Sequence, residues 1–527
     1  MQTRVYTQPP GVGRWAAAAL ALALLAPLLA AALAGFGLRV GLAAPLALVA
    51  LAAACAPLAR RLPPQWDGAF ARRPVAASVL AAVAVLAALR LSGVALYLAD
   101  AEQAQFSAFW FDPFYLGHSC YSGYWQAAEL SREGAANLYD PMLYSGKMGR
   151  FKLDEFLYLP QFLLLPRLGL ALGGDFHSLR ALWFAIEGAI VLAGLWAAGR
   201  WIGGGVGRRV WLLIPAVMLT SPVVVTLQVG NFQLAAIALS VLAMIQFERG
   251  RNLSGGALLG FAAIKLFPGL LGVYLLARRR WAAAAWTGAF AALYTVVAYL
   301  WLGPQPFEAF LHYQAPRIAN GEAWAFLEIE GLEWVSAINQ SVPGLVLKAK
   351  ILGLAGMDRA TMGAVAWLWT GAVVAMAIVA GLRHEAMSRL ERAAVWIALL
   401  GLTVFRSPFV PDHSGLFAPV WLWSLIAAAC VPSLRTAVLL ALGWLVCTAV
   451  LPVGGVPLPE VPARIALGTA VQAVAIGLCL WTVLRRPGLR SPSARFWRAD
   501  DSQRPVSAAM DGDVRDLPIS LTTKAEH

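Results

Sequence analysis

The sequence predicts an all-α integral membrane protein with about twelve transmembrane helices. Two observations carry this prediction. Of the 527 residues, 60% are hydrophobic and only 13% are charged, whereas soluble domains average about 25% charged residues. In addition, apolar runs of about 17–24 residues recur along the chain, and each is long enough to cross a hydrocarbon core of roughly 30 Å. The mean hydropathy of +0.68 agrees with this class.

The basic residues are placed as in cytoplasmic loops. The net charge is +13, and the Lys and Arg residues occur in short tracts between apolar runs, for example Arg60, Arg61 and Arg278–Arg280. This bias is typical of loops on the cytoplasmic side of a membrane. It does not form the continuous basic face expected of a nucleic-acid-binding domain, so no nucleic-acid partner is predicted. We therefore expect a multi-pass protein of the inner (plasma) membrane with both termini in the cytoplasm.

The predicted spans follow from hydropathy and this charge bias. In order, they cover residues 15–35, 38–58, 75–98, 181–199, 210–227, 232–247, 281–302, 362–381, 393–405, 415–431, 434–451 and 464–484. The first run could pass for a signal peptide, but a second apolar run follows at about residue 38. A pair of spanning helices is the better interpretation.

Residues 254–277 break this alternation. Both ends of the segment are basic, and Lys265 and Pro268 lie in its middle. A re-entrant hairpin with both ends in the cytoplasm satisfies the charge bias, whereas a single span does not. Irregular backbone at membrane depth is tolerated only where protein or water surrounds it. An ammonium at this depth costs roughly 2.5–3.5 kcal/mol on insertion scales, so Lys265 is expected to have a partner or a function.

The chain divides into three predicted regions. Residues 1–74 form two extra N-terminal transmembrane helices and a cytoplasmic loop, residues 75–484 form the main transmembrane domain, and residues 485–527 form a disordered cytoplasmic tail rich in polar residues. Three polar segments of the main domain are predicted to face the outer side, and a site would form where they meet. These outer segments are residues 100–178, 303–341 and 406–414.

The outer segments contain the candidate chemical groups. Asp112 lies in an apolar, aromatic stretch, where partial burial would let it act as a general base. The alternative is a solvated loop carboxylate, in which case Asp100 or Asp140 would take the role of base. His413 and Arg406 lie in the third segment and are candidates to contact a phosphate.

The cysteines give no sign of a disulfide framework or a zinc site. Four of the five lie in apolar runs, and Cys120 is alone in the first outer segment. No CxxC motif is present, and no cluster of His and Cys residues is apparent along the sequence. Neither a metal nor a cofactor is predicted.

Several motifs resemble glycosyltransferase family 87, the polyprenol-phosphate-mannose-dependent mannosyltransferases of the GT-C superfamily. The similar stretches are residues 124–141, 228–243, 254–281 and 339–341, together with Ser407-Pro408 followed by His413. Residues 228–243 contain Gly230 and Asn231, and residues 254–281 contain Lys265 before an Arg-Arg-Arg-Trp ending. The order and spacing of these motifs are more specific than any one of them.

This resemblance implies a GT-C-like fold, a lipid-linked sugar donor and inverting, metal-independent transfer on the outer face. It implies that Lys265, His413 and Arg406 bind the donor phosphate, and that Asn231, Asn339, Tyr124 and Asp140 line the cavity. The family commonly carries an Asp where this chain has Cys120. The catalytic base is therefore predicted to be Asp112.

The sequence thus predicts a membrane glycosyltransferase. It would move a hexose, with mannose as the first choice, from a polyprenyl-phosphate donor to a lipid or glycan acceptor. One alternative is a transporter or flippase, which would be expected to show broken helices in matching positions of two halves. The other alternative is an inactive scaffold, which the replacement of an acid by Cys120 keeps open.

Overall fold

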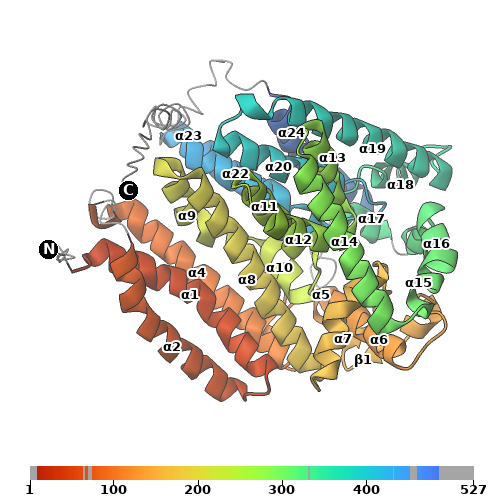
Figure 1. Ribbon diagram of the computed structural model, residues 1–527, viewed down its shortest axis with the longest axis horizontal. Helices are drawn as coiled ribbons and strands as arrows, with labels where there is room; N and C mark the ends of the chain where they lie inside the picture. Colours follow the sequence, from red (N-terminus) through yellow and green to blue (C-terminus); the bar gives the residue numbers. More distant parts are fainter. Residues whose placement is uncertain are drawn as a thin grey trace, which may run out of the picture.

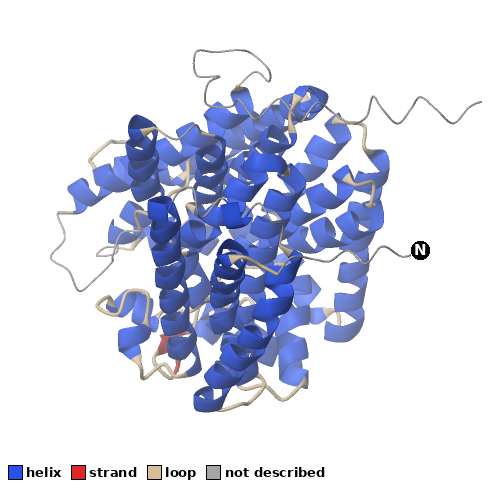
Figure 2. Ribbon diagram, turned by 90° about the vertical axis from the view of Figure 1, so that its left-hand side faces the viewer, coloured by secondary structure: helices blue, strands red, loops and turns tan. Residues whose placement is uncertain are grey.

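The computed structural model describes residues 9–62, 66–68, 74–329, 333–430, 433–450 and 460–485. These parts of the chain are helical throughout, apart from one small antiparallel hairpin of β1 (Lys147–Met148) and β2 (Phe151–Lys152) (Figure 2). The predicted all-α class is confirmed. The predicted C-terminal tail lies outside the described residues.

Seven of the described helices are long and apolar enough to cross a membrane. They are α1 (Val12–Gly35), α2 (Val40–Arg61), α4 (Pro74–Ala99), α8 (Phe176–Ile202), α14 (Trp281–Leu302), α19 (Arg359–Leu382) and α24 (Val461–Leu484). The pair α9 (Gly204–Met218) and α10 (Ser221–Val229) passes the same test together but is bent by 60°. The protein is therefore membrane-spanning with seven or eight candidate spans among the described residues, and the count of about twelve stays a prediction.

Three shorter helices fill the interior of the bundle, namely α11 (Gln233–Glu248), α20 (Arg389–Val404) and α22 (Phe417–Ala429). A fourth short helix, α23 (Leu434–Cys447), is mostly exposed. Most side chains of α11, α20 and α22 are buried, and Figure 1 shows these helices in the middle of the bundle. A helix of 16 residues rises only about 24 Å. These helices consequently fall short of a full hydrocarbon core, although their apolar sequences resemble spans.

The first two helices pack on the rest of the bundle. Helix α1 contacts α2, α4 and α8, as the red and orange helices of Figure 1 show. A Cβ atom on Gly188 of α8 would lie 2.6 Å from the Cδ2 methyl of Leu28 in α1, so the two helices are closely packed here. Leu28 belongs to the same buried cluster as residues of α8 and α11. The boundary near residue 74 stays a prediction.

The segment that was predicted to be a re-entrant hairpin is broken in its middle. It consists of α12 (Asn252–Ala262), two short 3-10 turns, η4 (Ala263–Lys265) and η5 (Phe267–Gly269), and α13 (Leu270–Ala277). At the break Leu266 adopts a positive φ of 65°. Helix α12 lies along α14, since Cβ atoms on Gly256 and Gly260 would meet side chains of α14. The residues that flank the segment also meet, because Arg278 Nη1 lies 2.5 Å from Glu248 Oε1.

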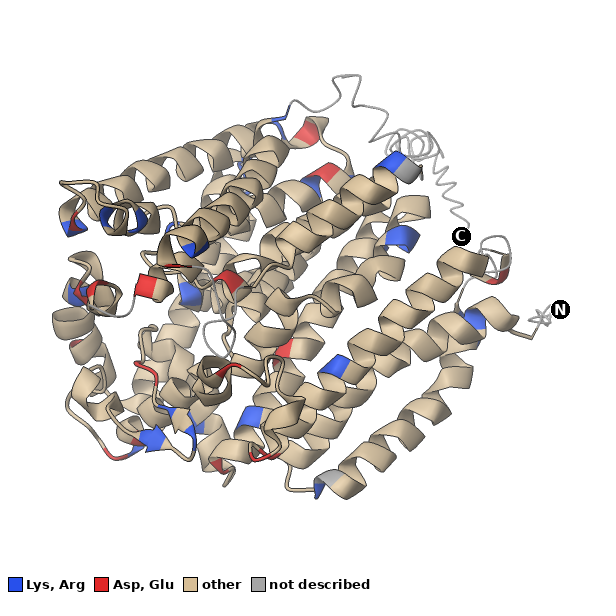
Figure 3. Cartoon of the chain, turned by 180° about the vertical axis from the view of Figure 1, so that it is seen from behind, with Lys and Arg blue, Asp and Glu red and all other residues tan. Residues whose placement is uncertain are grey.

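The remaining short elements connect these helices. They are η1 (Ala104–Phe106), α5 (Pro113–Gly117), α6 (Cys120–Arg132), η2 (Pro141–Tyr144), η3 (Pro160–Leu163), α7 (Leu164–Ala171), α15 (Gln305–Ala309), the π-helical turn η6 (Phe310–Gln314), α16 (Ala315–Ala319), η7 (Glu322–Glu328), α17 (Glu333–Ile338), α18 (Gly344–Ile351), η8 (His384–Ala386) and α21 (Asp412–Gly415). Elements α6, α7, α15 and α16 gather at the lower right of Figure 1. Figure 3 shows that charged residues are sparse along the long helices and frequent on the elements at this end.

Candidate active site

The three outer segments of the sequence analysis meet in the structure. The first and second segments are joined by the rings of Phe114 and Trp334, whose centroids lie 5.4 Å apart. The second and third are joined by a hydrogen bond of 2.7 Å that the backbone N–H of Gln340 donates to the carbonyl of Val410. The second polar segment therefore contacts both the first and the third, although the three are far apart in the sequence.

Asp112 is fully buried at the start of α5. Its carboxylate caps the helix by accepting a hydrogen bond of 2.9 Å from the backbone N–H of Phe114. An Asp followed by Pro113 is a favoured way to begin a helix, because Asp accepts from the free N–H groups and proline has no N–H to satisfy. The burial does not fit the alternative of a solvated loop carboxylate.

His413 is also buried, with 1% of its surface exposed. Its ring packs edge-on against Tyr115, at 5.8 Å between centroids. Neither ring nitrogen has a hydrogen-bond partner among the described residues, and the nearest carboxylate oxygen, of Asp412, is 3.7 Å from Nδ1. Burial lowers the pKa of His413 more than Asp412 raises it, so the imidazole is neutral. Both ring nitrogens are therefore available to bind a ligand.

Lys265 is held by neutral polar groups. Its Nζ donates to Asn231 Oδ1 at 2.5 Å and to the hydroxyl of Tyr158 at 3.2 Å. The Tyr158 hydroxyl lies 2.8 Å from that of Tyr124. Asn231 is positioned by Gly230, which ends α10 in the left-handed conformation at φ 75°. The structure therefore brings together Lys265, Asn231 and Tyr124, three of the site residues predicted from the sequence.

A further group of polar side chains continues from Asn231. Its Nδ2 donates to Cys120 Sγ at 3.7 Å, and this sulfur lies 3.8 Å from His118 Nε2. His118 Nδ1 lies 3.4 Å from Asp154 Oδ1. Burial lowers the pKa of His118, but the Asp154 carboxylate and Cys120 outweigh it and hold this pKa well above its usual value. Sequence reasoning missed this cluster because Asp154 follows the β1–β2 hairpin, far from the His-Ser-Cys motif.

Glu187 is a second residue that sequence reasoning missed. It lies in α8, 1% exposed, within electrostatic range of Lys265. The signal was available, since a single Glu inside an apolar run marks a partner or a function. A buried carboxyl group therefore lies near Lys265, beyond the neutral groups that bond to it.

Comparison with known proteins identifies the family of this chain. The model of glycosyltransferase family 87 matches residues 156–411. The chain belongs to glycosyltransferase family 87. The matched region contains Tyr158, Asn231 and Lys265 and ends two residues before His413. No curated protein and no solved structure matches the chain. Together with its apolar helices, the family makes this protein a membrane glycosyltransferase.

Two of the candidate cavity residues of this family 87 glycosyltransferase serve local structure. Asn339 donates through Nδ2 to the carbonyl of Pro408 at 2.9 Å and accepts through Oδ1 from the N–H of Val410 at 3.0 Å. It therefore shapes the third outer segment. Asp140 caps η2 by accepting from the N–H of Met142 at 3.0 Å, in a partly exposed position.

Arg406 lies in the third outer segment of the glycosyltransferase but turns away from His413. Its Nε donates to Thr370 Oγ1 at 3.1 Å, and its guanidinium lies 5.5 Å from the ring centroid of Trp367. Both partners belong to α19. In this conformation Arg406 contributes to the packing of α19, and its proposed contact with a phosphate would need a different rotamer.

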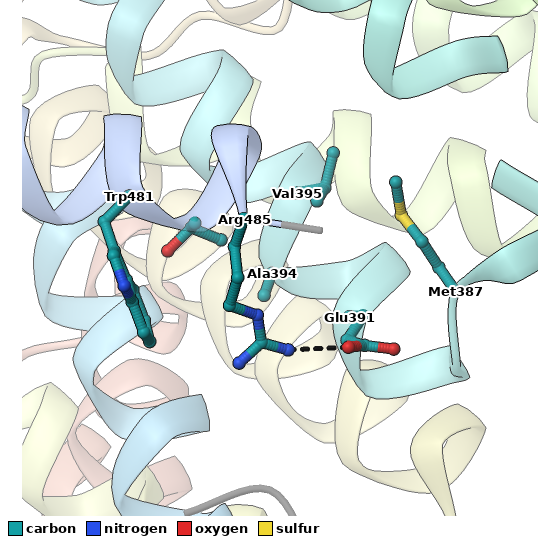
Figure 4. A pocket seen from close by; sticks show the side chains of 7 residues that line it. Met387, Glu391, Ala394, Val395, Trp481 and Arg485 are labelled. Carbon is teal, nitrogen blue, oxygen red and sulfur yellow. Dashed lines mark hydrogen bonds and ion pairs between the residues drawn. The ribbon is translucent and has the colours of Figure 1, made fainter. Parts of the chain in front are cut away.

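The pocket in Figure 4 belongs to a different part of the glycosyltransferase. It lies between α20 and α24, where Arg485 Nη2 bonds to Glu391 Oε1 at 2.6 Å. The other lining residues are Met387, Ala394, Val395, Trp481 and Thr482. None of the candidate catalytic or phosphate-binding residues lines this pocket.

Proposed function

We propose that this glycosyltransferase moves a hexose, with mannose as the first choice, from a polyprenyl-phosphate donor to a lipid or glycan acceptor. The reaction takes place at the extracytoplasmic face and inverts the anomeric configuration. The observation that carries the proposal is the half-buried Lys265, which donates to neutral partners, one of them Tyr158 of the first outer segment. A lipid-linked donor fits this position, because its polyprenyl chain stays in the bilayer while its phosphate reaches this cation.

The donor phosphate is the leaving group, and it gains charge as the glycosidic bond breaks. Fixed cations and donors stabilise such charge best in a site that excludes water. Lys265 supplies a cation, and His413 supplies a neutral imidazole with unpartnered nitrogens. Arg406 is the third proposed phosphate ligand, after a turn of its side chain away from Trp367.

Asp112 is the proposed general base. It takes the proton of the acceptor hydroxyl while the hydroxyl oxygen bonds to the anomeric carbon. The bond between that carbon and the phosphate oxygen breaks, and its electron pair leaves with the phosphate. Attack from the opposite face inverts the anomeric centre. A positioned carboxylate contributes about 10²–10⁴ to such a step, and the complete burial of Asp112 favours this role.

We also propose that residues 254–277 form a re-entrant hairpin that enters from the cytoplasm. The ion pair between Glu248 and Arg278 holds its two ends together, and the break at Leu266 lies at its tip. In this arrangement the hairpin carries Lys265 from the cytoplasmic side toward the outer segments.

Cysteine labelling tests this topology in a chain whose native cysteines have been replaced. Leu253→Cys and Arg279→Cys, at exposed positions on either side of the hairpin, should react with an impermeant maleimide only after permeabilisation. Ser145→Cys in the first outer segment should react in intact cells. Labelling of Leu253→Cys and Arg279→Cys from opposite sides would show a single span, and protection of Ser145→Cys in intact cells would reverse the orientation.

The variant Asp112→Asn tests the base. Asparagine is as good a helix cap as aspartate, so α5 should be retained, but its amide cannot accept the proton. The transfer rate with a polyprenyl-phosphate-mannose donor should fall about 10²–10⁴-fold. The exposed Glu133→Gln is the matched control and should leave the rate unchanged. Full activity of Asp112→Asn would remove Asp112 from the mechanism.

A further inference from the structure

Three side chains with metal-binding chemistry meet at the start of α6. The ligand atoms of His118, Cys120 and Asp154 all lie within 4.8 Å of one another. In a tetrahedral zinc site with one sulfur, one nitrogen and one oxygen ligand, typical bond lengths place these atoms roughly 3.3–3.6 Å apart. His118 faces Cys120 with Nε2 and Asp154 with Nδ1. One of these nitrogens would therefore bind the ion after a turn of the ring, together with smaller rotations of the other two side chains.

The backbone holds the three residues in place. The hydroxyl of Ser122 accepts from the N–H of Asp154 at 3.1 Å and donates to the carbonyl of Lys152 at 2.9 Å. A Cβ atom on Gly123 would lie 2.4 Å from the carbonyl oxygen of Asp154, so glycine is required where the two segments touch. The segment after β2 is thus fixed to the first turn of α6.

The other two candidate ligands are supported from the side. The ring of His118 stacks on Phe114, at 4.8 Å between centroids. Asn231 Nδ2 donates to Cys120 Sγ at 3.7 Å. Hydrogen bonds of this kind to a ligand atom orient it and tune a metal site. The side chains of His118 and Asp154 remain 20% and 23% exposed, so an ion can reach them.

The local charges suit a divalent cation. A Cys120 thiolate and the Asp154 carboxylate carry two negative charges, which balance the ion. Lys265 lies within electrostatic range of both Cys120 and Glu187, so its ammonium also interacts with the sulfur ligand.

We propose that His118, Cys120 and Asp154 bind a divalent transition-metal ion, with Zn²⁺ as the first choice. Mixed sulfur, imidazole and carboxylate ligands are typical of zinc sites. Any proton on the Cys120 sulfur or on the coordinating nitrogen of His118 is released on binding, because both ligands coordinate in their deprotonated forms. The site joins the start of α6 to the segment after β2 and does not depend on the proposed transfer reaction.

Titration of the purified full-length chain with Co²⁺ tests the site. A bound Co²⁺ should give a sulfur-to-metal charge-transfer band that saturates at one equivalent and disappears when Zn²⁺ is added. The band should be absent in Cys120→Ser, and the affinity of His118→Gln and Asp154→Asn should fall by more than about a hundredfold, beyond the effect of losing a supporting hydrogen bond. The matched controls, Cys55→Ser and His312→Gln, should bind as the wild type does.

A second measurement uses the wild-type chain and does not depend on the folding of any variant. Zn²⁺ should slow the reaction of Cys120 with a maleimide at least tenfold, and a chelator should restore it. The absence of a charge-transfer band, or equal labelling of Cys120 with and without Zn²⁺, would overturn the proposal. A band that persists in Cys120→Ser would assign the metal to another place. None of these readouts involves sugar transfer, so failure here is distinct from failure of the proposed function.

Discussion

The flanks and the break of the segment α12–α13 carry charged side chains that are paired in different ways. At its flanks, Glu248 meets Arg278 at 2.5 Å, Arg392 at 2.9 Å and His384 at 3.3 Å. At its break, Lys265 meets only neutral oxygen atoms within hydrogen-bond distance, among the residues that the structure describes. The carboxylate of Glu248 is thus paired with positively charged side chains, whereas the ammonium of Lys265 is hydrogen-bonded to neutral oxygen atoms.

This difference separates a structural role from a ligand-binding role. Removing one partner from a buried ion pair leaves an uncompensated charge and costs about 3–5 kcal/mol. A cation held by neutral groups keeps more of its charge available to an anion. The cluster around Glu248 should therefore determine the stability of the bundle, and the cluster around Lys265 should determine binding and transfer.

Between the two clusters, the largest expected effect is on transfer, in the variant Lys265→Gln. Glutamine retains hydrogen bonding to Asn231 and Tyr158 but cannot offset the charge of a leaving phosphate. The transfer rate should fall about 10²–10³-fold, as when one fixed transition-state donor is removed, with little change in melting temperature. The exposed Lys350→Gln is the matched control. A Lys265→Gln protein with a much lower melting temperature but a normal transfer rate per folded molecule would contradict this assignment. It would give the structural role to the cluster around Lys265.

The variant Glu248→Gln should have the opposite profile. It leaves Arg278, whose side chain is 3% exposed, without its nearest counter-charge. The free energy of unfolding should fall by about 3 kcal/mol, at the lower end of the range for buried pairs, because Glu385 remains 3.4 Å from Arg278. Chemical unfolding in detergent measures this change. The transfer rate per folded molecule should be unchanged, and a specific loss of that rate would contradict the comparison.

His413→Gln should have the smallest effect of the three. Burial lowers the pKa of His413, so the variant exchanges one neutral donor for another of similar reach. Loss of one well-oriented hydrogen bond to the donor costs about 1.4 kcal/mol, which is a tenfold effect. We expect this change in the KM for the donor, with kcat nearly constant. A loss comparable to that of Lys265→Gln would give His413 the larger share of phosphate binding.

The sequence predicted the class of the fold and part of the candidate site. Composition alone established a helical membrane protein, and the order of the motifs indicated that Asn231 and Lys265 belong to one site. Hydropathy did not separate spans from the short helices of the interior, since α11 is as apolar as the spanning helices. Their length and burial became known only from the packing of the bundle.

Side-chain direction and distant partners were beyond the sequence. Arg406 is close to His413 along the chain, yet packing against Trp367 turns it toward α19. Asp154 reaches His118 only because Ser122 and Gly123 allow the segment after β2 to touch α6. Contacts of this kind depend on the tertiary structure, and no local pattern records them.

The rate of sugar transfer per folded molecule tests the central claim most directly. The wild-type chain and the variants Lys265→Gln and Glu248→Gln are reconstituted with a polyprenyl-phosphate-mannose donor labelled in the sugar and with a membrane-lipid acceptor fraction. The account predicts a labelled product from the wild type, an equal rate from folded Glu248→Gln, and a rate about 10²–10³-fold lower from Lys265→Gln. The absence of product from the wild type with any polyprenyl-phosphate-hexose, or equal rates in wild type and Lys265→Gln, would contradict it.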